Sequence, residues 1–270
     1  MKLGFSTLAC MEASIADVIG YAKETGMNAI EFRLDKNDQI CGLDAHGVKA
    51  YLPILRDAGI VISDLGTSVS FQGYDAQKKT RVEQNMDLAA AVGAKAVRVI
   101  LGSCKKRVTD NPPADDCDGI VRALQELCDY GETCGVEVWT ETHGSFSTCA
   151  DMKRIVDAVN RPNLRVIWDI IHSVEFGESV QDSVSLLGDR FAHIHVKDGF
   201  RPDDPTWLVY TLSALGAGTV DTAGAVRALE AVGFDGIWSL EWEAAWHPEL
   251  IPLYDGIPAL LRAYDAYMNR

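Results

Sequence analysis

Residues 137–141 read EVWTE, and the chain repeats this design at 164–169 (LRVIWD), 191–195 (FAHIH) and 236–241 (GIWSLE). Each stretch is apolar and rich in β-branched or aromatic residues, which is typical of a buried parallel strand. Each also ends in one polar residue, and these residues are Glu141, Asp169, His195 and Glu241. A polar residue at the end of each of several buried strands is unusual unless these residues meet in one site. Convergence of three acids and an imidazole indicates a metal site.

Eight segments of this strand-like kind run along the 270 residues, separated by mostly helix-like segments and without an obvious linker. They lie at 2–7, 29–33, 61–67, 96–101, 137–141, 164–169, 191–196 and 236–241. One intervening helix is predicted between Thr148 and Pro162, and another ends before Gly135. Eight strand and helix repeats predict an α/β fold, a (β/α)8 TIM barrel that forms one domain over residues 1–270. In that fold the chemistry lies at the carboxyl ends of the strands.

Alternation along a strand predicts which side chains face the barrel interior together. By this rule Glu141 shares a face with His143, and His195 shares one with Lys197. Three carboxylates crowded round one imidazole would repel one another and raise their own pKa values unless a divalent cation lay between them. Oxygen-rich sites with one imidazole suit manganese, magnesium or cobalt, whereas structural zinc prefers thiolates and imidazoles. Manganese is therefore favoured as the cofactor, with magnesium, cobalt and zinc left open.

Four motifs carry a resemblance to a known family: ETH (141–143), WDIIH (168–172), HIHVKDGFR (193–201) and SLEWE (239–243). In this order they resemble the sugar phosphate isomerase/epimerase family, which has a xylose isomerase-like barrel. In the ketose 3-epimerases of that family, Glu, Asp, His and Glu from the fifth to eighth strands hold the metal. The resemblance therefore implies the metal ligands Glu141, Asp169, His195 and Glu241. The family's D-x-x-H and H-x5-R pairs look like Asp169 with His172 and His195 with Arg201, so the resemblance also implies that His172 and Arg201 bind substrate oxygens.

The resemblance also implies a reaction, in which a divalent-metal-dependent isomerase or epimerase acts on a keto-sugar or related polyol through an enediolate. This chemistry suits the residues, because a metal that chelates a carbonyl and a neighbouring hydroxyl acidifies the adjacent C–H bond. Glu141 and Glu241 would serve as base and acid on the two faces of the substrate.

His143 supports a rival reaction. It follows Glu141 by two residues and points inward just above it if the strand continues. A second base there suits a metal-dependent lyase or dehydratase, as in relatives that dehydrate inososes or cleave 3-keto C-glycosides. The plainer interpretation is a histidine hydrogen-bonded at the barrel rim. A non-catalytic metal-binding barrel is a third interpretation that the sequence leaves open.

The segment 199–218 is longer than a usual strand-to-helix connection and carries Trp207 and Tyr210, so it is a candidate for closure over a sugar-like ligand. Trp242 and Trp246, near the last strand's end, are predicted either to face a sugar or to pack at the rim. The stretch LGAGTVD (215–221) precedes a predicted helix and is a candidate phosphate site, although Asp221 near the cap would compete with an anion.

The net charge of −14 argues against a nucleic-acid partner, because nucleic-acid affinity rests on lysine and arginine neutralising phosphates. The repair nuclease endonuclease IV shares this type of barrel, but its trinuclear site needs additional histidines. The second, third and fourth strand ends, AIEFRL, VISDLGT and AVRVILGS, supply none. A small-molecule, sugar-like substrate is therefore the expected partner.

Seven cysteines without a C-x-x-C pair suit reduced thiols. The N-terminal apolar run is too short for a signal peptide, and Glu12 and Asp17 follow it at once. The chain is therefore expected in the cytoplasm, without a membrane partner. The sequence leaves a monomer and a homo-oligomer equally open.

Overall fold

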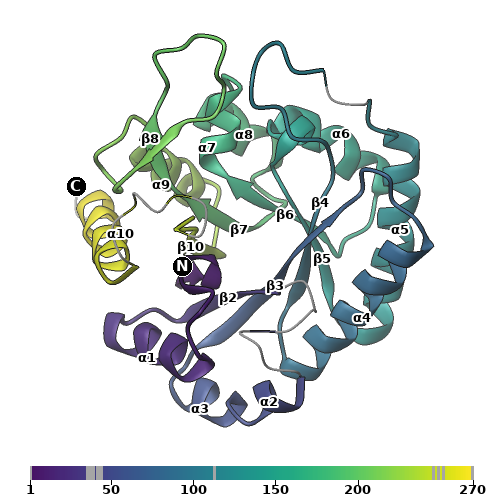
Figure 1. The fold of residues 1–270 in the computed structure, drawn as a ribbon, viewed down its shortest axis with the longest axis vertical. Coiled ribbons are helices and arrows are strands. Elements are labelled where there is room, and N and C mark those ends of the chain that lie inside the picture. Colours follow the sequence, from purple (N-terminus) through teal and green to yellow (C-terminus); the bar gives the residue numbers. More distant parts are fainter. Residues whose placement is uncertain are drawn as a thin grey trace.

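The eight predicted strands pair in parallel into one closed barrel (Figure 1). The structure is a computed structural model that describes residues 2–34, 40, 45–111, 114–244, 247, 250 and 253–268. Round the barrel the strands follow the order β1, β10, β7, β6, β5, β4, β3, β2. Their bounds are β1 (Lys2–Ser6), β2 (Ala29–Arg33), β3 (Val61–Ser70), β4 (Ala96–Ile100), β5 (Glu137–Glu141), β6 (Leu164–Asp169), β7 (Phe191–Val196) and β10 (Ile237–Leu240). The predicted (β/α)8 TIM barrel is confirmed.

Helices surround the barrel (Figure 1). They are α1 (Ile15–Thr25), α2 (Ala45–Lys49), α3 (Leu52–Asp57), α4 (Ala76–Val92), α5 (Cys117–Cys134), α6 (Cys149–Val159), α7 (Ile170–Glu175), α8 (Val180–Leu187), α9 (Thr222–Ala231) and α10 (Leu253–Met268), with 3-10 turns η1 (Thr7–Cys10) and η2 (Gly144–Phe146). The helices α5 and α6 lie where the sequence predicts them. Thr148 begins α6 by accepting a hydrogen bond from the N–H of Asp151. Gly135 ends α5 with φ of 71°, which glycine adopts without strain. In the described part of the chain, no helix is both long and apolar enough to cross a membrane.

The two faces of the strands meet different surroundings. Outward residues such as Val138, Trp168 and Ile194 join the main hydrophobic core between sheet and helices. Inside the barrel, three buried apolar residues form a small separate cluster: Ala96, Trp139 and Ile167. Many other inward residues are buried and polar or charged: Glu31, Asp64, Arg98, Glu141, Asp169, His193, His195, Ser239 and Glu241. TIM barrels are usually filled by branched aliphatic side chains, so this interior needs hydrogen-bond and charge partners instead.

The long connection after β7 forms a hairpin. Its strands β8 (Asp198–Phe200) and β9 (Thr211–Ser213) pair antiparallel, outside the barrel sheet. The connection after β4 projects beside it at the top of Figure 1, and Arg107 in that connection forms a bridge with Trp207. Both connections follow the carboxyl ends of their strands, so they lie at the end of the barrel where the chemistry is expected.

Replacing Leu124 by alanine should lower the free energy of unfolding by about 3 kcal/mol, because this α5 side chain is fully buried in the main core. The matched control is Ile54→Ala in α3, whose side chain is 46% exposed and whose loss should cost less than about 0.5 kcal/mol. Urea denaturation of both variants measures the difference. Equal losses would contradict the packing of α5 described above.

Candidate active site

Four side chains from neighbouring strands meet inside the carboxyl end of the barrel. One ligand atom from each of Glu141, Asp169, His195 and Glu241 lies within 4.8 Å of all the others, and the four residues are buried. In the β6 and β7 pair, Asp169 lies directly opposite His195. The Nδ1 atom of His195 is 3.0 Å from Glu141 Oε1 and 3.4 Å from Glu241 Oε2. The structure thus brings together the four residues predicted as metal ligands; these four are called the acid–histidine cage below.

Two buried cations balance the cage, and neither was given a role from the sequence. The Nζ atom of Lys197 is 2.8 Å from Asp169 Oδ2 and 2.6 Å from Glu241 Oε2, and it also pairs with Glu243. The Nη1 atom of Arg98 is 2.6 Å from Oε2 of Glu141. The sequence could have pointed to Arg98, because it is a charged residue inside the apolar run AVRVI and strand alternation gives it the same face as its inward neighbours.

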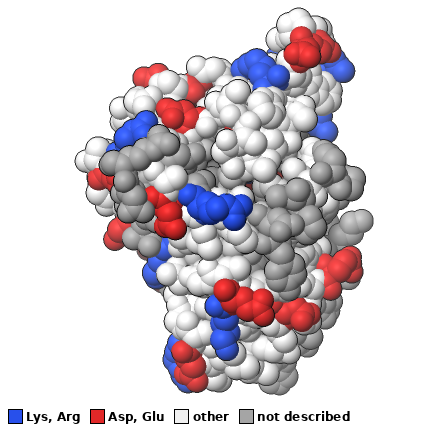
Figure 2. All heavy atoms as spheres, turned by 90° about the vertical axis from the view of Figure 1, so that its left-hand side faces the viewer, with Lys and Arg blue, Asp and Glu red and all other residues white. Residues whose placement is uncertain are grey.

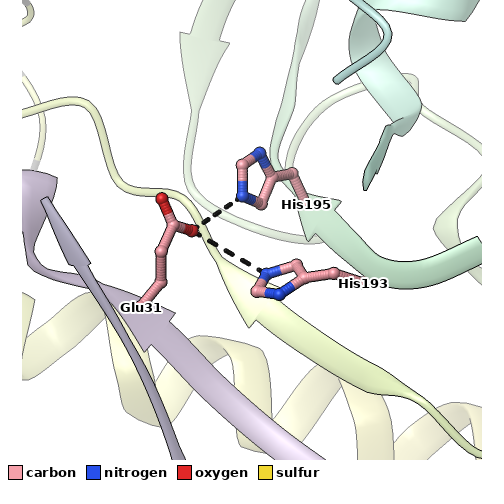
Figure 3. Close-up of side chains that lie close together, drawn as sticks. All are labelled: Glu31, His193 and His195. Carbon is pink, nitrogen blue, oxygen red and sulfur yellow. Dashed lines mark hydrogen bonds and ion pairs between the residues drawn. The ribbon is translucent and has the colours of Figure 1, made fainter. Parts of the chain in front are cut away.

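Glu31 of β2 is a further acid at the site that the sequence prediction missed. Its Oε2 atom lies 2.8 Å from Nε2 of His195 (Figure 3). Glu141 contacts the other ring nitrogen, Nδ1. The same Glu31 oxygen lies 3.8 Å from Nε2 of His193, which precedes His195 by two residues on β7. The lone acid in the strand AIEFR could have pointed to this position.

Confinement shifts the pKa values of these groups in different directions. Burial raises the pKa of Glu241, and its cationic neighbours offset this only in part. Burial would raise the pKa of Glu141 as well, but Arg98 and His195 hold it well below its usual range. Burial alone would lower the pKa of Lys197, yet the surrounding carboxylates keep it well above its usual value. The two cage glutamates therefore differ in their affinity for a proton.

His143 lies beside the cage. Its extended backbone, with φ of −157° and ψ of 148°, continues the alternation of β5 beyond Glu141. The centre of its ring lies 5.0 Å from that of His172. Burial and the charge of His172 lower the pKa of His143 to about 4, which favours the neutral imidazole. Gly144 then turns the chain with φ of 61°, and a Cβ there would lie 2.5 Å from the carbonyl oxygen of Ser103, so only glycine fits.

His172 and Arg201, the two predicted substrate-binding residues, both contact Glu175. His172 Nδ1 lies 3.0 Å from Glu175 Oε2, and its Nε2 lies 3.6 Å from Asp169 Oδ2. Burial would lower the pKa of His172, but these two carboxylates raise it to about 9. Arg201 is exposed and donates a hydrogen bond to the backbone carbonyl of Glu175. Glu175 also accepts a hydrogen bond from the N–H of Tyr210, so this buried acid, missed from the sequence, ties the hairpin to α7.

The hairpin is tied to the connection after β4 as well. Arg107 donates hydrogen bonds to Asp204 at 3.1 Å and to Thr206 at 3.0 Å. Its guanidinium group lies 4.5 Å from the centre of the Trp207 ring. Backbone hydrogen bonds also link 106–108 with 206–208. The segment 199–218, which was predicted to cover a ligand, is therefore joined to the connection after β4.

Two other aromatic residues that were candidates for sugar contact pack inside the protein. Tyr210 and Trp242 are buried in the main hydrophobic core, which favours packing over contact with a sugar. Trp246 lies outside the described residues.

The stretch LGAGTVD (215–221) surrounds a side chain of the protein itself. The carboxylate of Asp198 accepts hydrogen bonds from the N–H groups of Gly216, Gly218 and Val220. A Cβ at Gly218 would lie 2.1 Å from Asp198 Oδ1, so glycine makes room for this carboxylate. Asp221 caps α9, as the sequence suggested. The backbone donors that a phosphate would use here are therefore occupied by Asp198.

The family model for the xylose isomerase-like TIM barrel matches residues 19–263. The chain belongs to the xylose isomerase-like TIM barrel family. This membership confirms the resemblance to sugar phosphate isomerases and epimerases that the four motifs predicted.

Several known proteins are similar to the chain. An inosose isomerase of Bacillus licheniformis is 26% identical over 259 residues, which cover 89% of this chain and 88% of that protein. The solved structure of the IOLI protein with a bound zinc atom has a TM-score of 0.79 and 20% identity, over 99% of this chain and 98% of that one. The probable 3-DHS dehydratase AsbF from Bacillus anthracis has a TM-score of 0.74 and 18% identity, over 97% and 99%. The two structures share the fold, and the reaction must be inferred from the site.

The acid–histidine cage fits a divalent cation in the chemistry of its donors. Three carboxylates and one imidazole match the ligands of manganese, magnesium or cobalt, and zinc also accepts this set. Together with Glu31, the cage has four buried carboxylates, and Arg98 and Lys197 are two buried cations that pair with its members. A bound dication would restore the balance of charge.

Replacing Lys197 by methionine should make thermal stability depend on a divalent cation more strongly than in the wild type. Without the ammonium, the buried carboxylates of the metal-free protein lose a partner, which should cost about 3–5 kcal/mol. A cation in the cage relieves this repulsion, in addition to the roughly 2.7 kcal/mol that any ligand at 100 times its Kd supplies. Thermal unfolding with and without Mn²⁺ measures the effect.

The control is Lys153→Met, which removes a half-exposed lysine paired with Asp157 on α6. Its midpoint should rise with Mn²⁺ by the same amount as that of the wild type. If Lys197→Met also rises by only that amount, Lys197 does not balance the cage.

Proposed function

We propose that this protein is a divalent-metal-dependent isomerase or epimerase that acts on a keto-sugar or related polyol through an enediolate. The observation that supports this most directly is the acid–histidine cage, whose four ligand-type side chains converge at the carboxyl end of the barrel. The similarity to an inosose isomerase over most of both chains agrees with this chemistry.

Glu141, Asp169, His195 and Glu241 would hold the cation, which supplies Lewis acidity toward a carbonyl and its neighbouring hydroxyl. Glu141 and Glu241 are the proposed base and acid. One takes the proton from the carbon beside the carbonyl, and the electrons of that C–H bond form the enediolate. For epimerisation, the other returns a proton to the opposite face of the same carbon. For isomerisation, it protonates the former carbonyl carbon instead, and the proton of the neighbouring hydroxyl moves to the former carbonyl oxygen.

His172 and Arg201 are the proposed substrate-binding residues. Both contact Glu175, His172 at its carboxylate and Arg201 at its backbone carbonyl, which supports a shared role. The hairpin and the connection after β4 would limit access of water to the reaction. Because Asp198 occupies the backbone donors of LGAGTVD, we favour a substrate without a phosphate group at this position.

Manganese is the proposed metal, a small sugar-like molecule the proposed partner and the cytoplasm the proposed compartment. The acidic net charge disfavours nucleic acid. On the face shown in Figure 2, acidic and basic side chains are interspersed among the described residues. Inward positions of β2, β3 and β4 carry Glu31, Asp64 and Arg98 rather than the extra histidines of a repair nuclease. A homo-oligomer is compatible with this function but not required by it.

The experiment that tests the proposal uses Mn²⁺-loaded protein and a panel of free ketoses, inososes and 3-keto-glycosides in deuterated water. NMR follows deuterium uptake at carbon and the products. Solvent exchange with a retained carbon skeleton would support the proposal. Metal binding without turnover on any member would support a non-catalytic metal-binding barrel instead.

Replacing Glu241 by glutamine should lower the rate of exchange by at least about 10²-fold, because the amide can neither give nor take the proton and binds the cation more weakly. The rate on the best substrate of the panel is the measurement. Glu230→Gln, an exposed change on α9, should retain the wild-type rate. Full turnover by Glu241→Gln would rule out its proposed role.

A lyase or dehydratase is the second candidate, and the position of His143 favours it. Its neutral imidazole lies beside the cage and 5.0 Å from the ring of His172, where it offers a base besides the cage glutamates. AsbF, a probable dehydratase, shares the fold. In this case the panel should show loss of water or of an aglycone, and His143→Asn should abolish that loss while leaving deuterium exchange within about threefold. Equal loss of both would give His143 another role.

A further inference from the structure

The imidazole of His195 has two different neighbours on its two nitrogen atoms. Nδ1 faces the cage, at 3.0 Å from Glu141 Oε1 and 3.4 Å from Glu241 Oε2. Nε2 faces away from the cage and lies 2.8 Å from Oε2 of Glu31. Figure 3 shows this carboxylate reaching His195 from β2. The ring therefore lies between the proposed metal site and one carboxylate outside it.

Glu31 reaches this position across the barrel interior, because β1 and β10 lie between β2 and β7 in the sheet. The residue is 1% exposed, so its negative charge is held away from water and needs a close donor. Gly66 of β3 makes room for it, since a Cβ there would lie only 2.8 Å from Glu31 Oε1. The space, the burial and the short distance to Nε2 indicate a specific contact.

A neutral imidazole carries one proton and one lone pair on its two ring nitrogens. Without a cation, Nδ1 and Nε2 each face a carboxylate, and both can carry a proton. Once a cation takes Nδ1, the carboxylate at 2.8 Å from Nε2 holds the remaining proton there, which leaves the lone pair of Nδ1 directed into the cage. Carboxylates that hold metal-binding histidines in this way typically raise metal affinity by about 10–100-fold. We infer that Glu31 is a positioning residue that fixes the tautomer and orientation of His195 so that Nδ1 is the ligand atom. This inference rests on the proposed metal dependence of the site.

A second cation is the competing explanation, because Glu31, His193 and His195 could also hold a metal ion. His195 would then need both ring nitrogens free of protons, which is the imidazolate form. His193 is also farther away, with its Nε2 at 3.8 Å from Glu31 and its Nδ1 at 3.5 Å from Asp64. One proton between Glu31 and His195 accounts for the contact without a second metal.

The first test is metal affinity. Mn²⁺ binding to the full chain, followed by calorimetry, should be about 10–100-fold weaker in Glu31→Leu than in the wild type. Glu31→Gln keeps an oxygen acceptor without the charge, and its affinity should fall between the two. Metal analysis should find one cation per chain in the wild type. Two per chain, with one lost in Glu31→Leu, would overturn the inference in favour of the second metal site.

The second test reads the tautomer directly and needs no activity. In the Zn²⁺-loaded protein labelled with ¹⁵N-histidine, NMR should show a proton on Nε2 of His195 and none on Nδ1. In Glu31→Leu the strongly hydrogen-bonded Nε2 proton should be lost or its signal should move. An unchanged His195 spectrum together with unchanged Mn²⁺ affinity in both Glu31 variants would overturn the inference.

Asp64→Asn is the matched control. Burial and the charge of Glu31 raise the pKa of Asp64 well above its usual value, so asparagine closely matches its neutral form. Asp64 faces His193 rather than His195, and its replacement should leave Mn²⁺ affinity within about twofold. A loss as large as that of Glu31→Leu would mean that any buried change in this layer weakens the site, and would also overturn the inference. A wild type that binds no cation would instead remove the proposed function itself.

Discussion

In a closed eight-stranded barrel, inward side chains at the same level contact one another and have no free path to bulk water. When several of them are ionised, their charges must be balanced inside the barrel, because each unpaired charge is costly in that environment. Here the inward acids come from β2, β3, β5, β6 and the end of β10, whereas Arg98 and Lys197 supply positive charge. The proposed metal would complete this balance of charge. Any mutation that removes one of the buried charges should therefore disturb the arrangement of the others.

The same constraint explains how the site is divided between rigid and adaptable parts. The cage side chains come from the barrel strands or their ends, and all four also contact a buried group outside the cage: Arg98, Lys197 or Glu31. The two proposed substrate-binding residues instead come from connections, with Arg201 on the hairpin and His172 on α7. Glu175 joins these two connections. In the proposed enzyme, such an arrangement would keep the metal ligands fixed while the connections determine which molecule can enter.

Much of this arrangement could be predicted from the sequence, for a physical reason. Strand alternation and strand order are local, so the run LRVIWD was enough to place Asp169 at a carboxyl end facing inward. The partner of Glu31 could not be predicted in this way, because its contact with His195 depends on how the barrel closes across two intervening strands. Asp198 presents the same problem, since its partners lie 18 to 22 residues further along a connection whose path depends on a hairpin.

The carboxylate of Asp198 has a consequence for the ligands that this protein can accept. A phosphate that approached LGAGTVD would compete with an anion attached to the same chain, whose effective concentration is in the millimolar range or higher. The competitor is always present and loses little entropy on binding. In the connection after β7, the backbone N–H groups that could bind a phosphate are therefore already bound to the carboxylate of Asp198. In a barrel with the same backbone, a small residue at this position would turn a structural loop into a phosphate receptor without moving a strand.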